Sequence, residues 1–127
     1  MIKRLLLSLI LILGFAACDA VDGEDSGVFI RVRNNSDVTF DQVTIITGNR
    51  EGFFGTILPR ENSEYQQFET AFRYGSVFLR INGKPLQLVP NDYVGETPLR
   101  DGFYTYKIGL SSANLSDASL TFEFSKD

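Results

Sequence analysis

The amino-acid sequence predicts an all-β fold, a sandwich of seven to eight antiparallel strands in residues 27–127. Apolar and polar residues alternate there with a period of two, which is typical of half-buried strands. Gly, Pro, Asn or Asp interrupts this alternation roughly every eight to twelve residues. No internal repeat indicates a solenoid or a propeller instead.

The first expected strand has Val28, Ile30 and Val32 on one face and Arg31 and Arg33 on the other. Successive side chains of a strand point to opposite sides, so this pattern predicts one buried face and one solvent-facing face.

In the second expected strand, Phe40 is out of phase with Val43 and Ile45. A β-bulge inserts one extra residue into a strand and so shifts the side-chain alternation. We therefore expect a bulge near Asp41 and Gln42, which would return all three apolar residues to the buried face.

Residues 63–74 allow two interpretations. Tyr65, Phe68 and Phe72 lie three and four residues apart, which is helical spacing, but the segment is also compatible with a strand. We expect a strand over residues 63–68, followed by a loop or one helical turn.

Asn82-Gly83 is the strongest local signal, because this dipeptide favours the two-residue turn of a β-hairpin. It would join strands at residues 77–81 and 86–88. Pro85 places the returning strand at a sheet edge, because proline donates no backbone hydrogen bond.

Residues 103–110 and 119–124 are expected to form a closing hairpin. Seven or eight strands in a domain of this length fit an immunoglobulin-like β-sandwich. The absence of Trp and of a second Cys distinguishes it from antibody domains. Four phenylalanines are expected in the core: Phe40, Phe54, Phe122 and Phe124.

The segment Leu99-Arg-Asp-Gly-Phe-Tyr104 resembles the L-x-x-G-x-Y element of many immunoglobulin-like and transthyretin-like modules. More broadly, residues 32–45, the aromatic spacing of residues 68–74, and residues 92–99 are similar to small envelope lipoproteins of uncharacterised function. This similarity implies a shared domain and supplies no activity.

Residues 1–18 are expected to form a helical export signal. Lys3 and Arg4 precede thirteen mainly apolar residues, Leu5–Ala17, a length typical of a signal peptide and too short to span a bilayer. The following Cys18 completes a segment that resembles the lipobox of bacterial lipoproteins, although Phe15 stands where that family usually has Leu, Val or Ile. The resemblance implies cleavage before Cys18 and lipidation of its thiol. An ordinary secretory signal is the alternative.

Residues 19–26 carry four acids and no base, which predicts an acidic flexible tether before the domain at residues 27–127. Eight residues span at most about 30 Å, so the domain would stay close to its membrane. An acidic run after a lipidated Cys resembles lipoprotein sorting signals. In some lineages these retain the protein in the inner membrane and in others they direct it to the outer membrane. We expect the bacterial cell envelope and the outer membrane, with inner-membrane retention and a plain spacer as alternatives.

The composition excludes several kinds of chemistry. Without His and with one Cys, the chain alone cannot build a Ser-His-Asp relay, a Cys/His zinc site or an internal disulfide. A net charge of -4 argues against nucleic-acid binding. We expect no catalytic residue, no metal site and no cofactor.

Three acids, Asp92, Glu96 and Asp101, lie close together in an expected loop. They could bind Ca²⁺, contact a partner or, as a carboxylate pair, hydrolyse a glycoside. Their spacing lacks the Asp/Asn alternation of a calcium loop, so we interpret them mainly as solvated carboxylates.

Surface candidates for partner contact are residues out of phase with the expected core face, namely Phe29, Phe78 and one of Phe103 and Tyr104. Arg31, Arg33 and Arg80 could form an outward stripe, or could pair with acids on neighbouring strands. The expected contacts for a protein or glycan near the membrane are Phe29, Phe78, Arg31, Arg33, Asp92 and Glu96.

Three functions follow from these features. The first is a membrane-anchored, non-catalytic binding domain, with the membrane contacted through the lipidated Cys18. The second is a structural accessory subunit of an envelope complex. The third, a carboxylate-dependent hydrolase, is the weakest, because it would need two acids about 5–10 Å apart in a cleft.

Overall fold

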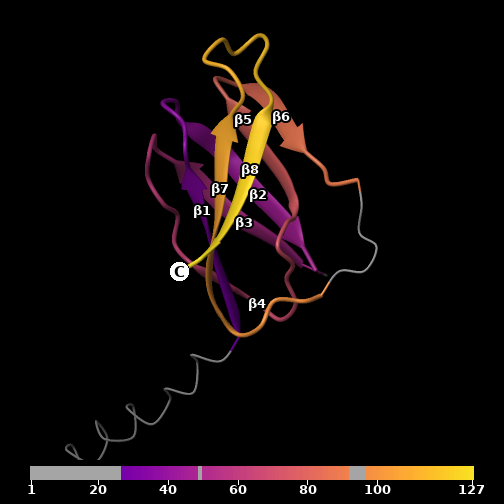
Figure 1. The fold of residues 1–127 in the computed structure, drawn as a ribbon. Coiled ribbons are helices and arrows are strands. Elements are labelled where there is room, and N and C mark those ends of the chain that lie inside the picture. Colours follow the sequence, from indigo (N-terminus) through magenta and orange to yellow (C-terminus); the bar gives the residue numbers. More distant parts are fainter. Residues whose placement is uncertain (1–26, 49, 92–96) are drawn as a thin grey trace, which may run out of the picture.

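The computed structural model describes residues 27–48, 50–91 and 97–127. It contains eight strands, β1 Val28–Asn34, β2 Phe40–Thr47, β3 Arg50–Ile57, β4 Gln66–Phe68, β5 Ser76–Ile81, β6 Lys84–Leu88, β7 Gly102–Leu110 and β8 Leu120–Lys126. Sheet A has the strand order β4-β1-β7-β8, and sheet B has the order β3-β2-β5-β6. Figure 1 shows the two sheets packed face to face, and the expected all-β sandwich is confirmed.

The expected signal at residues 1–18 and the tether at residues 19–26 lie outside the described residues. Within the described part of the chain, no helix is long and apolar enough to cross a membrane.

One pair of strands corrects the expectation of an antiparallel sandwich. β1 and β7 run parallel through seven paired positions, from Val28 opposite Gly102 to Asn34 opposite Ile108. The other neighbouring strands are antiparallel. The alternation of apolar and polar residues predicts which face of a strand is buried, but it does not predict in which direction the strand runs beside its neighbour. The direction of β7 beside β1 depends on the path that the chain takes through sheet B. In an immunoglobulin constant-type domain the first strand pairs with the second, whereas here β1 pairs with β4 and β7.

The expected alternation in β1 is confirmed. Val28, Ile30 and Val32 are at most 2% exposed and pack in the core between the sheets, while Arg31 and Arg33 lie on the outer face.

The expected bulge in β2 is also confirmed, because the register with β3 shifts between Phe40 and Val43. Both of these residues are fully buried as a result.

The Asn82-Gly83 hairpin between β5 and β6 is confirmed. Both turn residues have positive φ, 52° and 80°, as the favoured two-residue hairpin turn requires. Ile81 and Lys84 close the pairing, and Pro85 lies in β6, an edge strand of sheet B.

Residues 63–74 contain a strand shorter than expected and no helical turn. β4 covers only Gln66–Phe68, and the segment after it has no regular structure. Buried side chains hold that segment instead. The Thr47 hydroxyl accepts a hydrogen bond from the Phe72 N–H (3.0 Å) and donates one to the Tyr74 carbonyl (3.1 Å), and the buried Tyr106 hydroxyl donates to the Phe72 carbonyl.

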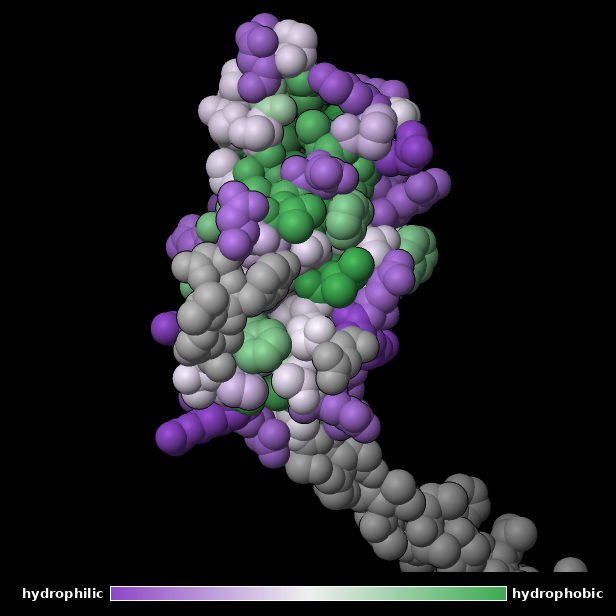
Figure 2. Space-filling view, turned by 90° about the vertical axis from the view of Figure 1, so that its right-hand side faces the viewer, coloured by the Kyte–Doolittle hydropathy of each residue, from purple (hydrophilic) through white to green (hydrophobic). Residues whose placement is uncertain are grey.

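The two open sides of the sandwich differ. Beside β3 and β4, the Gln66 amide donates to the Phe53 carbonyl and the Arg50 guanidinium donates to the Gln67 carbonyl, so side chains join the two sheets. Beside β6 and β8, half-buried apolar side chains lie between the sheets, and Figure 2 shows this side with an apolar stripe. They include Leu86, Leu88, Phe122 and Phe124.

Asn34 is a polar residue that is fully buried at the end of β1. Its amide group donates to the carbonyls of Val38 (2.7 Å) and Ile57 (2.9 Å). Its side-chain oxygen accepts from the backbone N–H and the hydroxyl of Ser36, at 3.0 and 2.6 Å. An Asn side chain can make four such bonds, so this residue is fully satisfied and fixes the loop between the sheets.

Asn34→Asp should destabilise the fold by about 2–4 kcal/mol, because a buried carboxylate would face two carbonyl oxygens without a donor. Chemical denaturation followed by circular dichroism measures this change. The matched control is Asn62→Asp on the surface, where we expect a change within about 0.5 kcal/mol. Equal effects of the two substitutions would contradict a structural role for the Asn34 amide.

Candidate functional site

Three aromatic rings meet on the outer face of sheet A. The parallel register places Phe29 opposite Phe103, and their rings stack with centroids 4.8 Å apart and planes 13° apart. Tyr65, just before β4, makes an edge contact with Phe103 at 5.0 Å. With Arg31 and Asp127, these residues form what we call the aromatic–arginine cluster.

Arg31 and Asp127 supply the charges of this cluster. The Arg31 guanidinium lies 4.9 Å from the centre of the Tyr65 ring, and its Nε lies 3.6 Å from the Asp127 carboxylate. That carboxylate also accepts hydrogen bonds from the Tyr65 hydroxyl at 2.5 Å and the Thr105 hydroxyl at 2.8 Å. The backbone N–H of Asp127 donates to the Phe103 carbonyl at 2.9 Å. Charged and aromatic groups are therefore held in fixed positions.

This arrangement is suited to binding. Phe103 remains 39% exposed, and Tyr and Arg side chains are enriched at the energetic centres of protein interfaces. Burial, followed by the hydrogen bond to Asp127, raises the pKa of the Tyr65 hydroxyl above 10.0, and Arg31 opposes this shift to a smaller extent. General acid–base catalysis requires a pKa near the working pH, so the Tyr65 hydroxyl does not meet that need near neutrality.

The structure brings only part of the expected contact set together. Phe29 and Arg31 belong to the cluster, and Arg33 lies two positions further along β1, with weak hydrogen bonds to the side chains of Asn35 (3.4 Å) and Asn62 (3.5 Å). Arg31 has an acidic neighbour in Asp127, but this residue follows β8 and does not lie on a strand adjacent to β1, where the pairing alternative placed the acid.

Phe78 lies on the other sheet. It pairs with Thr44 on β2, which also pairs with the 62% exposed Phe53 of β3.

Arg80 lies on the same strand as Phe78 and donates to the Gly83 carbonyl at 2.8 Å. The alternative of an outward stripe of three arginines is therefore wrong, because Arg80 lies in sheet B, whereas Arg31 and Arg33 lie in sheet A.

Cys18, Asp92 and Glu96 lie outside the described residues. Asp101, the third acid of the group with Asp92 and Glu96, is exposed and directly precedes β7. Among residues 27–48, 50–91 and 97–127, no three His, Cys, Asp or Glu side chains are placed to hold a metal ion.

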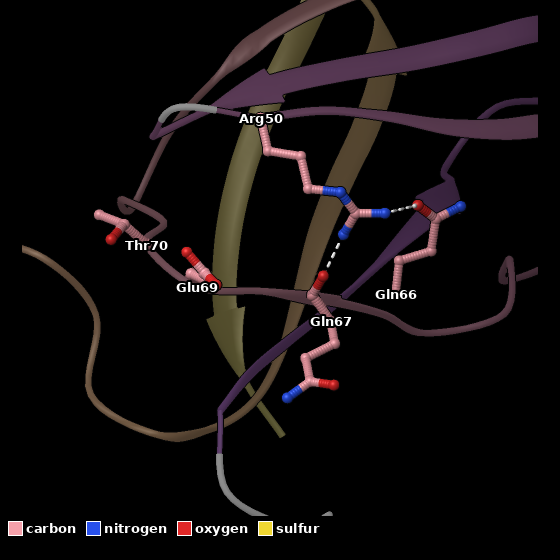
Figure 3. A pocket seen from close by; sticks show the side chains of 5 residues that line it. All are labelled: Arg50, Gln66, Gln67, Glu69 and Thr70. Atoms are coloured by element: carbon pink, nitrogen blue, oxygen red, sulfur yellow. Dashed lines mark hydrogen bonds between the residues drawn. The ribbon is translucent and has the colours of Figure 1, made fainter.

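A second feature, a pocket beside β3 and β4, was not predicted from the sequence. A pocket of about 720 Å³ is lined by Arg50, Gln66, Gln67, Glu69 and Thr70 (Figure 3). Nothing in the sequence marks Arg50 as a binding residue, because it lies between Gly48 and Gly52, in a stretch whose composition predicts a turn. We call this feature the Arg50 pocket.

No family model and no curated protein matches the chain. Among solved structures, it is similar to an NMR structure of a protein from Eubacterium rectale, with 12% sequence identity and a TM-score of 0.55. The match covers 80% of this chain and 91% of that one. At this identity the likeness concerns the fold alone.

Tyr65→Phe should remove a contribution to stability that depends on pH. The pKa of the Tyr65 hydroxyl is raised in the folded protein, so this contribution is complete below the unfolded value of about 10 and disappears as the pH rises through the folded pKa. We expect the difference in unfolding free energy between wild type and Tyr65→Phe to be constant between about pH 7 and 9 and to shrink above about pH 10. Urea titrations at each pH measure it, and a difference that already falls below about pH 9 would contradict the assignment.

Proposed function

We propose that the protein is a lipid-anchored, non-catalytic binding module of the bacterial cell envelope. Cys18 provides the membrane anchor, residues 19–26 act as a short tether, and the aromatic–arginine cluster contacts a protein or glycan close to the membrane. We favour the outer membrane as its location.

The observation that carries this proposal is the exposed cluster itself. Phe29, Tyr65 and Phe103 come from three separate segments, and Phe103 stays 39% exposed beside a fixed guanidinium. An aromatic ring on a solvent-facing sheet surface stabilises a partner contact when it is covered. Phe29 is the second residue of β1, so the cluster lies near the point where the proposed tether enters the domain.

Between the two sandwich types that the sequence resembles, we favour the transthyretin-like one. The strand order departs from that of immunoglobulin domains, which supports this choice. The L-x-x-G-x-Y element is compatible with both types, and in it the Tyr104 hydroxyl donates to the Arg100 carbonyl at 2.7 Å.

A structural accessory subunit is the second candidate function. It is favoured by a different surface, the outer face of sheet B, where Phe53 is 62% and Ile46 is 40% exposed. On this hypothesis the protein would bind one stoichiometric partner through sheet B. The carboxylate-dependent hydrolase gains no support, because Asp92 and Glu96 lie outside the described residues.

Lipidation is tested by inhibiting signal peptidase II in cells that produce the full chain. The uncut precursor should accumulate, and Cys18→Ser should prevent both cleavage at this site and incorporation of labelled fatty acid. The control is a secreted protein with an ordinary signal, whose processing should not change. Normal maturation of this protein under the inhibitor would reject the anchor.

The binding surface is tested by crosslinking the full chain in its native membrane, followed by pull-down. Phe103→Ala should reduce partner recovery by about tenfold or more, as truncation of a central interface aromatic does. Phe53→Ala is the matched control, because it removes the same ring from sheet B. Loss of the partner with Phe53→Ala alone would instead favour the accessory-subunit function.

A further inference from the structure

The Arg50 pocket lies where the chain enters the domain. β1 and β4 pair here through Val28 and Phe68, and a Cβ atom added at Gly27 would lie 2.5 Å from the Gln67 side chain. In Figure 3, Arg50 enters the pocket from β3 on one side, and Glu69 and Thr70 belong to the segment after β4 on the other side. The pocket volume of about 720 Å³ lies within the range of small-molecule sites.

Arg50 is held in place before any ligand binds. Its guanidinium donates to the Gln67 carbonyl and to the Gln66 side-chain oxygen (3.4 Å), and its central carbon lies 4.6 Å from the centre of the Phe68 ring. Two of its five N–H groups are used in these bonds, which leaves three without a partner among residues 27–48, 50–91 and 97–127. A planar guanidinium with several donors matches the oxygens of a phosphate group.

The opposite wall carries a negative charge and a hydroxyl. Glu69 is exposed, and no ion pair joins it to Arg50 although both residues line the same pocket. The wall is packed closely against the β2–β3 turn, because a Cβ atom added at Gly48 would lie 2.0 Å from the Thr70 carbonyl oxygen. The pocket therefore carries two opposite charges that do not form an ion pair with each other.

We propose that the Arg50 pocket binds a phosphoethanolamine group. Its phosphate would accept hydrogen bonds from Arg50, and its ammonium would pair with the Glu69 carboxylate, so each charge of the pocket gains a partner of opposite sign. Thr70 can donate to a phosphate oxygen. A neutral sugar would leave both charges without a counterion, and the Phe68 ring that it could stack on already lies against the guanidinium.

This chemistry has two sources, the headgroup of a phospholipid and a soluble phosphoethanolamine ester. The choice between them rests on the proposed anchoring. A tether of eight residues keeps the pocket within about 30 Å of the membrane surface, and the pocket lies at the tethered end of the domain. We therefore commit to the lipid headgroup, and the soluble ester is an outcome of the test.

The pocket is tested first with a soluble probe. The full chain in detergent is titrated with glycerophosphoethanolamine, and the side-chain amide signals of Gln66 and Gln67 are followed by NMR. We expect saturable shifts with a dissociation constant on the order of 1 mM, as the small size of the probe implies. Glycerophosphoglycerol, which lacks the ammonium, should bind about tenfold more weakly. Equal binding of both probes, tighter binding of a neutral sugar, or no shift would overturn the proposal.

Matched variants separate the pocket from general charge effects. Glu69→Gln should weaken glycerophosphoethanolamine binding about tenfold and leave glycerophosphoglycerol binding unchanged or stronger. Glu64→Gln makes the same charge change outside the pocket and should leave both affinities unchanged. These glutamates are exposed, so both variants should fold. An equal loss of affinity in the two variants would overturn the site.

A last comparison distinguishes the sources. In nanodiscs that contain phosphatidylethanolamine, the Gln66 and Gln67 signals of the anchored protein should already be at their bound positions and should not respond to added probe. In nanodiscs of phosphatidylglycerol alone, the probe should still titrate the pocket. Titration in both bilayers would assign a soluble ester and overturn the lipid source. The detergent experiment reads the pocket even if Cys18 is not lipidated, so failure of the anchor and failure of the site remain distinguishable.

Discussion

The parallel pairing of β1 with β7 is the constraint on which the rest of the structure depends. It joins segments about seventy residues apart into the centre of sheet A, with β4 and β8 at its edges. The same register sets Phe29 beside Phe103 on the outside and keeps Tyr104 and Tyr106 in the core. One face of this strand pair lines the core and the other forms the outer surface. A shift of the pairing register by one residue would therefore bury the arginines of β1 and expose its core residues.

The two surfaces that we assign to binding differ in physical character. The aromatic–arginine cluster is a surface whose charges already neutralise one another, since Arg31 lies beside Asp127. The Arg50 pocket is a hollow whose opposite charges, on Arg50 and Glu69, do not form an ion pair with each other. The first favours a large partner that covers aromatic area, and the second favours a small ligand that supplies the missing counter-charges.

Local chemistry made much of the fold predictable. Asn82-Gly83 specifies its turn by backbone preference, and the phase of Phe40 against Val43 requires a bulge. The direction of β7 beside β1 was not predictable, because it depends on the whole chain path. Phe29 and Arg31 could be recognised from alternation in one strand. Tyr65 and Asp127 could not, because only the folded sheet brings the residue before β4 beside the residue after β8.

The segment from residue 69 to residue 74 has no regular structure, yet its backbone is bonded to buried side chains. Phe72 is held by Thr47 of sheet B and Tyr106 of sheet A, and the Ala71 carbonyl accepts from the Leu99 N–H at 2.8 Å. Displacing it would break hydrogen bonds to the buried side chains of Thr47 and Tyr106, so it shares the rigidity of the core. A ligand would therefore meet a wall already in its final shape, and its association rate would be set by diffusion rather than by a loop closing over it.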